Sequence, residues 1–116
     1  MMEGSPYDYL TQKYDVINKN FGIDKKVRIN DYLAVGKALE FLQKWEELEK
    51  LGDLARKQYP TSALGIYYQA RSYEATGKSK KAMRTYQSAY GQEEVAFITI
   101  DFMLQKAELI KEDFGY

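Results

Sequence analysis

The sequence contains no cysteine and no histidine, and each absence excludes a class of chemistry. Without cysteine the chain can form no disulfide, and without either residue it has no thiolate or imidazole ligand for a metal. The Ser-His-Asp and Cys-His mechanisms need an imidazole base, so both are excluded for this polypeptide. We therefore expect no catalytic residue, no cofactor-binding residue and no metal ligand, and we predict that the chain by itself is not an enzyme.

A net charge of one sign and long apolar runs are also missing. Seventeen lysines and arginines balance seventeen aspartates and glutamates, so no overall field attracts nucleic acid or an anionic membrane. No apolar run approaches the roughly 18 residues that a membrane span needs, and the first five residues lack the apolar stretch of a signal peptide. We expect neither nucleic acid nor membrane as a partner, and the sequence indicates no compartment.

Apolar and aromatic residues are plentiful. The 116 residues are 45% hydrophobic and include 11 tyrosines, which is typical of a packed domain and not of a disordered chain. This length supports one domain with a core, so we predict a single domain over residues 1–116.

The first helix is predicted from its capping residues and its apolar stripe. Ser5 can cap the orphan amides and Pro6 suits a first helical turn, while Gly22 is a typical terminator. The prediction is a helix over 7–20, followed by a connector. The apolar residues of the stripe follow helical spacing: Tyr7, Leu10, Tyr14, Ile17 and Phe21.

Residues of similar type then recur 34 positions apart. The pattern is a small residue, an aromatic three positions later, a turn glycine, and then an alanine and an aromatic on the next helix. Small residues let two antiparallel helices approach closely, and aromatics fill the space where the helices diverge. The second block fills these positions with Ala70, Tyr73, Gly77, Ala82, Tyr86 and Ala89. The first block has fewer matches, namely Tyr32, Gly36, Leu39, Leu48, Ala55 and Pro60.

Five further helices follow from these blocks. We predict helices over 31–43 and 46–59 in the first block, with Asn30 as the cap and Pro60 as the stop. The second block predicts helices over 62–76 and 79–90, and a last helix over 94–112 covers the open end of the stack. Gly52 costs about 1 kcal/mol against alanine inside a helix, so we predict that it is a site of close packing.

These blocks resemble the tetratricopeptide repeat. Gln43, Gly52 and Gln69 depart from its pattern, which has glycine, an aromatic and leucine there. The resemblance implies an all-α fold, a right-handed superhelix of two helix hairpins with an N-terminal helix and a C-terminal capping helix. It divides the chain into an N-terminal helix and connector (1–28), two repeats (29–62 and 63–96) and a cap (97–116). It also implies a non-catalytic protein-interaction module.

A second resemblance covers more of the chain and supports an alternative. Segments 14–22, 58–62 and 73–89 are similar to the C-terminal helical tail of bacterial putative esterases, which are α/β-hydrolases. The G-x-S-x-G nucleophile elbow of those enzymes is absent here, so the resemblance implies no activity. On this alternative the chain is an accessory tail that packs on or stabilises a serine hydrolase domain, and it has no ligand of its own.

In tetratricopeptide repeats the first helix of each hairpin lines a concave groove. Mapped onto this sequence, the groove positions are Leu33, Lys37, Glu40, Phe41, Leu64, Tyr67, Arg71, Glu74, Asp101 and Gln105. Lys37 and Arg71 occupy the same position in successive repeats and could together hold a peptide carboxylate. Alternatively, Lys37 pairs with Glu40 and Arg71 with Glu74 along their own helices.

The apolar residues among these groove positions also predict that something covers the groove. The expected occupants are a peptide, a partner domain such as the hydrolase, a second copy in a homodimer, or the N-terminal helix folded back.

Overall fold

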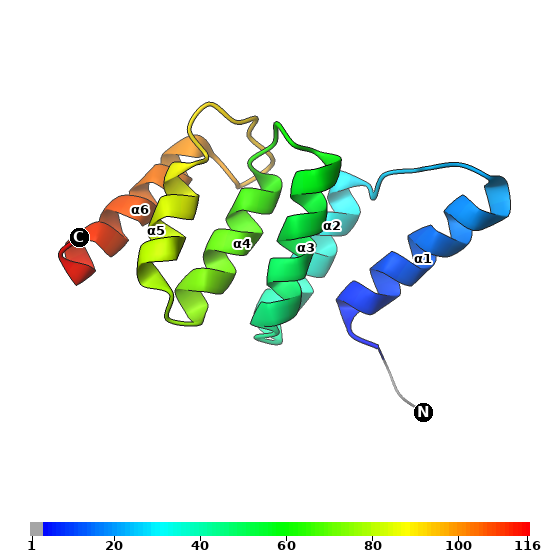
Figure 1. The fold of residues 1–116 in the computed structure, drawn as a ribbon, viewed down its shortest axis with the longest axis horizontal. Helices are drawn as coiled ribbons and strands as arrows, with labels where there is room; N and C mark the ends of the chain where they lie inside the picture. Colours follow the sequence, from blue (N-terminus) through cyan, green and yellow to red (C-terminus); the bar gives the residue numbers. More distant parts are fainter. Residues whose placement is uncertain (1–3) are drawn as a thin grey trace.

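The computed structural model describes residues 4–116, which form six α-helices and no strand, so the all-α prediction is confirmed. The helices are stacked side by side along the longest dimension of a 51 × 34 × 19 Å molecule (Figure 1). Their bounds are α1 Pro6–Phe21, α2 Ile29–Phe41, α3 Trp45–Gln58, α4 Leu64–Ala75, α5 Ser79–Gln87 and α6 Ile100–Phe114. Within residues 4–116, no helix combines the length and the apolarity that crossing a membrane would take.

Helix α1 lies at one end of the stack and has the predicted caps. The Ser5 hydroxyl accepts a hydrogen bond from the Asp8 amide at 3.1 Å, and Gly22 ends the helix with a φ of 61°. Tyr14 joins α1 to α2, because its hydroxyl donates to Asp31 Oδ2 at 2.6 Å and accepts from the Arg28 amide at 3.1 Å. The helix packs against α2 and α3.

The first hairpin consists of α2 and α3, and its cap differs from the prediction. Arg28 is the N-cap residue and makes no side-chain cap bond. The helix therefore begins two residues earlier than expected, at Ile29, and Asn30 lies inside its first turn. Gln43 stands where the repeat pattern has a turn glycine, yet it adopts a φ of 57°. The connection to α3 keeps the left-handed geometry without the residue that favours it.

The second hairpin, α4 and α5, occupies the centre of the molecule. Gly77 makes the predicted turn with a φ of 82°. Helix α4 packs against both α3 and α5, and for that reason almost every residue from Leu64 to Tyr73 is buried. Helix α5 ends at Gln87, three residues before the predicted end.

Three glycines allow the helices to approach closely. A Cβ atom added to Gly52 of α3 would lie 2.8 Å from the Gly65 carbonyl oxygen of α4, and one added to Gly65 would lie 2.5 Å from the Gly52 oxygen. A Cβ atom at Gly36 would overlap the Tyr68 ring. The prediction that Gly52 is a close-packing site is confirmed, and its partner is backbone of the next repeat.

The segment before α6 is the largest difference from the predicted helices. We expected a helix from residue 94, whereas α6 begins at Ile100. Val95 and Ile98 close a tight turn with two reciprocal backbone hydrogen bonds of 3.1 and 2.8 Å, and Ala96 within it has a φ of 52°. The Thr99 hydroxyl then caps α6 by accepting from the Phe102 amide at 3.1 Å.

A candidate binding groove between α2 and α4

Side chains from three segments surround a hollow of about 480 Å³ on one face of the stack. Helices α2 and α4 supply five of them, and the turn before α6 supplies the sixth. We call this feature the α2–α4 groove. It is lined by Leu33, Lys37, Glu40, Tyr67, Tyr68 and Phe97.

Aromatic rings form the floor and one wall of the α2–α4 groove. Tyr67 and Tyr68 are buried, and their rings meet edge to face with centroids 5.5 Å apart. Phe97 lies at a right angle to Tyr67 at 5.3 Å, and 55% of its surface is exposed. The tight turn at Ala96 therefore holds an exposed phenylalanine beside a buried tyrosine.

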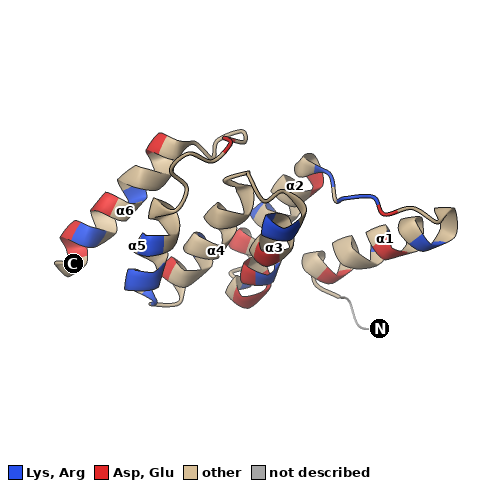
Figure 2. Ribbon diagram, turned by 45° about the horizontal axis from the view of Figure 1, so that its top comes forward, with Lys and Arg blue, Asp and Glu red and all other residues tan. Residues whose placement is uncertain are grey.

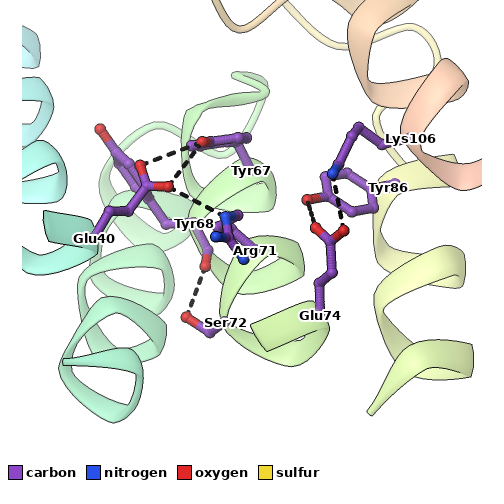
Figure 3. Close-up of polar contacts among 8 residues, drawn as sticks. All are labelled: Glu40, Tyr67, Tyr68, Arg71, Ser72, Glu74, Tyr86 and Lys106. Atoms are coloured by element: carbon purple, nitrogen blue, oxygen red, sulfur yellow. Dashed lines mark hydrogen bonds and ion pairs between the residues drawn. The ribbon is translucent and has the colours of Figure 1, made fainter. Parts of the chain in front are cut away.

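The Glu40 carboxylate is fully engaged at the side of the groove. It accepts hydrogen bonds of 3.1 and 3.2 Å from the Tyr67 hydroxyl, and its Oε1 lies 3.3 Å from Arg71 Nε (Figure 3). The Arg71 guanidinium also lies 4.7 Å from the centroid of the Trp45 ring. Burial, and then the nearby Glu40 charge, raise the pKa of Tyr67 above its usual range, so this phenol stays protonated as a donor.

A second acid–cation pair lies one repeat further along. Glu74 accepts from the Tyr86 hydroxyl and from Lys106 Nζ, each at 2.8 Å (Figure 3). Burial and the hydrogen bond to Glu74 raise the pKa of Tyr86. Glu74 follows Glu40 by 34 residues. In both pairs the cation lies two helices after the acid: Arg71 of α4 pairs with Glu40 of α2, and Lys106 of α6 pairs with Glu74 of α4.

Lys37 has no such acid. It is exposed at the edge of the groove, and within residues 4–116 no carboxylate forms an ion pair with it. Both pairings predicted along one helix are wrong, because Glu40 and Glu74 instead pair with Arg71 and Lys106 of the following helices. The prediction that Lys37 and Arg71 together hold a peptide carboxylate is wrong as well, because the Arg71 guanidinium pairs with Glu40 and lies over the Trp45 ring.

Six of the ten predicted groove residues do not line the α2–α4 groove. Two of them, Arg71 and Glu74, instead form the ion pairs with Glu40 and Lys106 described above. Leu64 is fully buried in the core, because α4 is covered on both sides. Phe41 is 86% exposed but does not line the α2–α4 groove. Asp101 and Gln105 line a separate hollow of about 390 Å³ on α6 with Leu104, Glu108 and Leu109.

The error on α6 has a geometric cause. Lys106, and not Gln105, reaches the acid of the preceding repeat. One residue on a helix corresponds to a rotation of about 100°, so a shift of one position turns Asp101 and Gln105 away from the groove. The predicted register assumed an uninterrupted 34-residue repeat, whereas the turn at 95–98 changes the spacing before α6.

Two groove residues were not predicted. Phe97 falls inside a segment that we expected to be helical, and only the non-helical turn at Ala96 brings it to the groove. The repeat pattern assigns a groove position to Tyr67 and none to Tyr68. Its hydroxyl donates to the Tyr32 carbonyl oxygen at 3.1 Å, and burial raises its pKa.

Helix α1 does not cover the groove, so the expectation that it folds back there is wrong. It instead borders a different hollow of about 450 Å³ beside α3, which is lined by both acids and lysines. The lining residues of this hollow are Tyr7, Glu46, Glu49, Lys50, Asp53, Leu54, Lys57 and Gln69. Residues 4–116 contain no group of three or more acidic side chains arranged to hold a metal ion.

Charges of both signs are distributed over the molecule, with one exception. Helix α5 carries Lys80, Lys81 and Arg84 and no acid (Figure 2). Lys81 Nζ lies 4.6 Å from the Tyr73 ring centroid and Lys80 Nζ 5.7 Å from that of Tyr116. These cations rest on aromatic faces and lie outside the α2–α4 groove.

Comparison with known proteins supports the fold. No known protein family's sequence model matches the chain, and no curated protein matches it. The crystal structure of an uncharacterised protein from Capnocytophaga ochracea DSM 7271 superposes with a TM-score of 0.89 and 34% sequence identity over 97% of this chain. The chain spans 31% of the length of that protein. The same helical architecture therefore occurs as part of a longer polypeptide whose activity is not established.

Proposed function

We propose that this chain is a non-catalytic interaction module that binds a protein segment in the α2–α4 groove. Its two hairpins are tetratricopeptide-like repeats of a right-handed superhelix, and α6 is the capping helix. The observation that carries the proposal is the position of Phe97. Phe97 is 55% exposed and lines a hollow together with Tyr67 and Tyr68, and a concave site lined by aromatic side chains is typical of a binding site.

The chemistry of the groove favours binding over catalysis. The chain has no imidazole and no thiol. Burial raises the pKa values of Tyr67 and Tyr68, so neither phenol is a base near neutral pH. The Glu40 carboxylate is held by Tyr67 and Arg71. These groups fix the shape of the groove, and none is arranged as an acid, base or nucleophile toward a bound molecule.

Photo-crosslinking in the cells that make the protein tests this proposal. A benzophenone amino acid replaces Phe97 in the natural polypeptide, and the control places it at Tyr9 of α1, which is 70% exposed and outside the groove. We expect a discrete, reproducible adduct from position 97 and none of the same identity from position 9. Equal adducts from both positions, or none from position 97, would reject the groove as the binding site.

The second candidate is an accessory tail of a serine hydrolase, and one observation favours it. The similar protein from Capnocytophaga ochracea extends well beyond the matched region, since this chain spans 31% of its length. On this proposal the groove receives a surface of the catalytic domain. The crosslink from position 97 would then join the module to a hydrolase domain, and a G-x-S-x-G segment would be found in the same reading frame.

A further inference from the structure

We propose that the hollow between α1 and α3, which we call the α1–α3 hollow, binds an arginine residue of a protein segment. The guanidinium lies against Glu46 and Glu49, and the backbone carbonyl of the arginine accepts a hydrogen bond from Gln69. The α1–α3 hollow shares no lining residue with the α2–α4 groove, so this second site goes beyond the proposed function. Three observations carry the inference: a buried glutamine with a free amide nitrogen, acids that no cation pairs with, and an aromatic ring supplied by α1.

The Gln69 side chain supplies a hydrogen-bond donor to the α1–α3 hollow. Gln69 is only 8% exposed, and it lines the hollow. Its Oε1 accepts from Arg56 Nη1 at 2.7 Å, whereas the hydrogen bonds of residues 4–116 include none from its Nε2. A buried amide that donates to no protein acceptor costs free energy. Its nitrogen can donate to the carbonyl oxygen of a ligand.

This donor is present because the chain departs from the repeat pattern at two positions that contact each other. Gln69 stands where the pattern has leucine, and Gly52 stands where it has an aromatic residue. A Cβ atom added to Gly52 would lie 2.6 Å from Gln69 Cγ, so a larger residue at 52 would displace the glutamine. A leucine at 69 would serve packing alone. The two departures together keep a polar amide at the α1–α3 hollow.

Two carboxylates of α3 determine the charge of the ligand. Within residues 4–116, neither Glu46 nor Glu49 forms an ion pair. Glu49 accepts only a neutral donor, the Tyr73 hydroxyl, at 3.1 Å. Residues three apart are neighbours on a helix surface, so both carboxylates can bind one cation. A guanidinium suits this arrangement better than an ammonium, because its planar fork of five donors can contact two carboxylates at once.

The other charged groups of the α1–α3 hollow leave its sign negative. Lys57 lies 3.0 Å from Asp53, and both are more than half exposed, so this pair is weak in water. Lys50 also lines the hollow and is exposed. Burial, and then the Asp53 charge, raise the pKa of Tyr7, so its phenol keeps its proton. The neutral Tyr7 ring can contact a guanidinium through a cation–π interaction.

A pair of capped amino acids tests the charge requirement. We would titrate the chain with N-acetyl-L-arginine methylamide and with the citrulline derivative, which has nearly the same shape and no charge, and follow the backbone amides by ¹⁵N NMR. We expect the arginine derivative to shift the amides of Glu46, Glu49 and Gln69 saturably. It should bind about threefold or more tightly than the citrulline derivative at low salt, and salt should reduce this preference.

Matched variants assign the preference to the carboxylates. Glu46→Gln keeps the shape of the side chain and removes its charge, and we expect it to lower the preference for arginine over citrulline by about twofold or more. Glu112→Gln removes an exposed acid of α6 outside the hollow and should bind both derivatives as the parent does. Equal affinity for the two derivatives in the parent, or a preference that Glu46→Gln leaves unchanged, would overturn the inference.

The contact with Gln69 needs a readout of its own. Gln69→Leu restores the leucine of the repeat pattern and removes the donor. We expect this variant to bind the arginine derivative more weakly and to bind agmatine, which has a guanidinium and no carbonyl, as the parent does. Equal losses for both compounds would show that Gln69 only shapes the hollow, and the carbonyl contact would be wrong.

The source of the arginine is tested with the same measurement. Tighter binding of the capped derivative than of free L-arginine supports a residue within a protein segment, because the capped form carries peptide groups on both sides. Tighter binding of free L-arginine would overturn the protein partner in favour of the amino acid itself. None of these measurements involves position 97, so this inference and the proposed function can fail separately.

Discussion

Tyr86 of α5 and Lys106 of α6 donate to the two different oxygens of one carboxylate, that of Glu74 on α4. Three helices are therefore joined at a single acidic side chain. The phenol comes from the second helix of the same hairpin, and the ammonium comes from the next element of the stack. The equivalent carboxylate of Glu40 joins α2 to α4 through Tyr67 and Arg71. Interactions of this kind fix the rotation of each helix about its axis in a way that apolar contacts alone do not.

The Tyr86 hydroxyl is expected to contribute measurably to stability. Tyr86 is fully buried, and Tyr86→Phe removes the donor while the Glu74 carboxylate stays in place. We expect the free energy of unfolding to fall by about 1.5–3 kcal/mol, as for a hydrogen bond to a charged acceptor. Urea denaturation measures the change. Tyr9→Phe, at a position 70% exposed, is the matched control and should change stability by less than about 0.5 kcal/mol.

Gly52→Ala tests the close approach of α3 and α4. Alanine is the better helix former by about 1 kcal/mol, so propensity alone predicts a more stable protein. The added methyl group, however, would lie 2.8 Å from the Gly65 carbonyl oxygen, which is backbone and cannot rotate away. We expect overpacking to prevail and to cost about 1–3 kcal/mol in urea denaturation. An increase in stability would show that the two helices separate easily.

Much of the fold was predictable because its signals are local. Ser5 and Gly22 lie within one turn of the ends of α1, and the glycine at position 77 lies in the turn that it forms. Burial in α2, α3 and α5 follows helical periodicity, whereas α4 is buried over almost its whole length. The positions of the helices, and most of the residues at which they begin and end, could therefore be predicted from short segments of sequence. The cap at Asn30 was wrong because Arg28 starts the helix with its backbone alone, which no side-chain pattern reveals.

The groove was less predictable because it depends on distant residues. The pairing of Arg71 with Glu40 joins positions 31 residues apart in the sequence, and an equally plausible acid, Glu74, lies on the same helix. Phe97 reaches the groove only through a turn with a positive φ at Ala96, a residue type that gives no such signal. The 34-residue spacing identified Lys37, Glu40 and Tyr67 as groove residues. It did not show that Glu40 has a cation as partner.

The buried tyrosines predict a loss of stability at alkaline pH. Burial raises the pKa values of Tyr32, Tyr67, Tyr68 and Tyr86 above the ordinary 10.0. Above pH 10 these phenols ionise in the unfolded chain but stay protonated in the folded one, so the unfolded state binds fewer protons. The stabilising contribution is complete below pH 10 and decreases as the pH rises beyond it.

We therefore expect the urea midpoint to fall progressively above pH 10. Phenolate absorbance should increase together with unfolding and not before it, apart from the exposed tyrosines. Tyr86→Phe removes one of the groups and should make the pH dependence shallower. A phenolate signal from all tyrosines in a chain that is still helical by circular dichroism would contradict the burial seen here.

The last prediction separates the binding role of the groove from its structural role. Tyr67 contacts Tyr68, Phe97 and Phe102 with its ring and is buried, so Tyr67→Ala should cost about 3–5 kcal/mol of stability and is unsuitable for testing binding. Phe97→Ala removes a ring that is 55% exposed and should cost about 1 kcal/mol or less. We expect Phe97→Ala to melt near the parent temperature by circular dichroism and to lose binding of the partner that crosslinks to position 97. If it unfolds as readily as Tyr67→Ala, Phe97 holds the turn before α6 in place, and its exposure is no evidence of a contact surface. If it stays folded and binds that partner as the parent does, Phe97 does not contribute to binding in the α2–α4 groove.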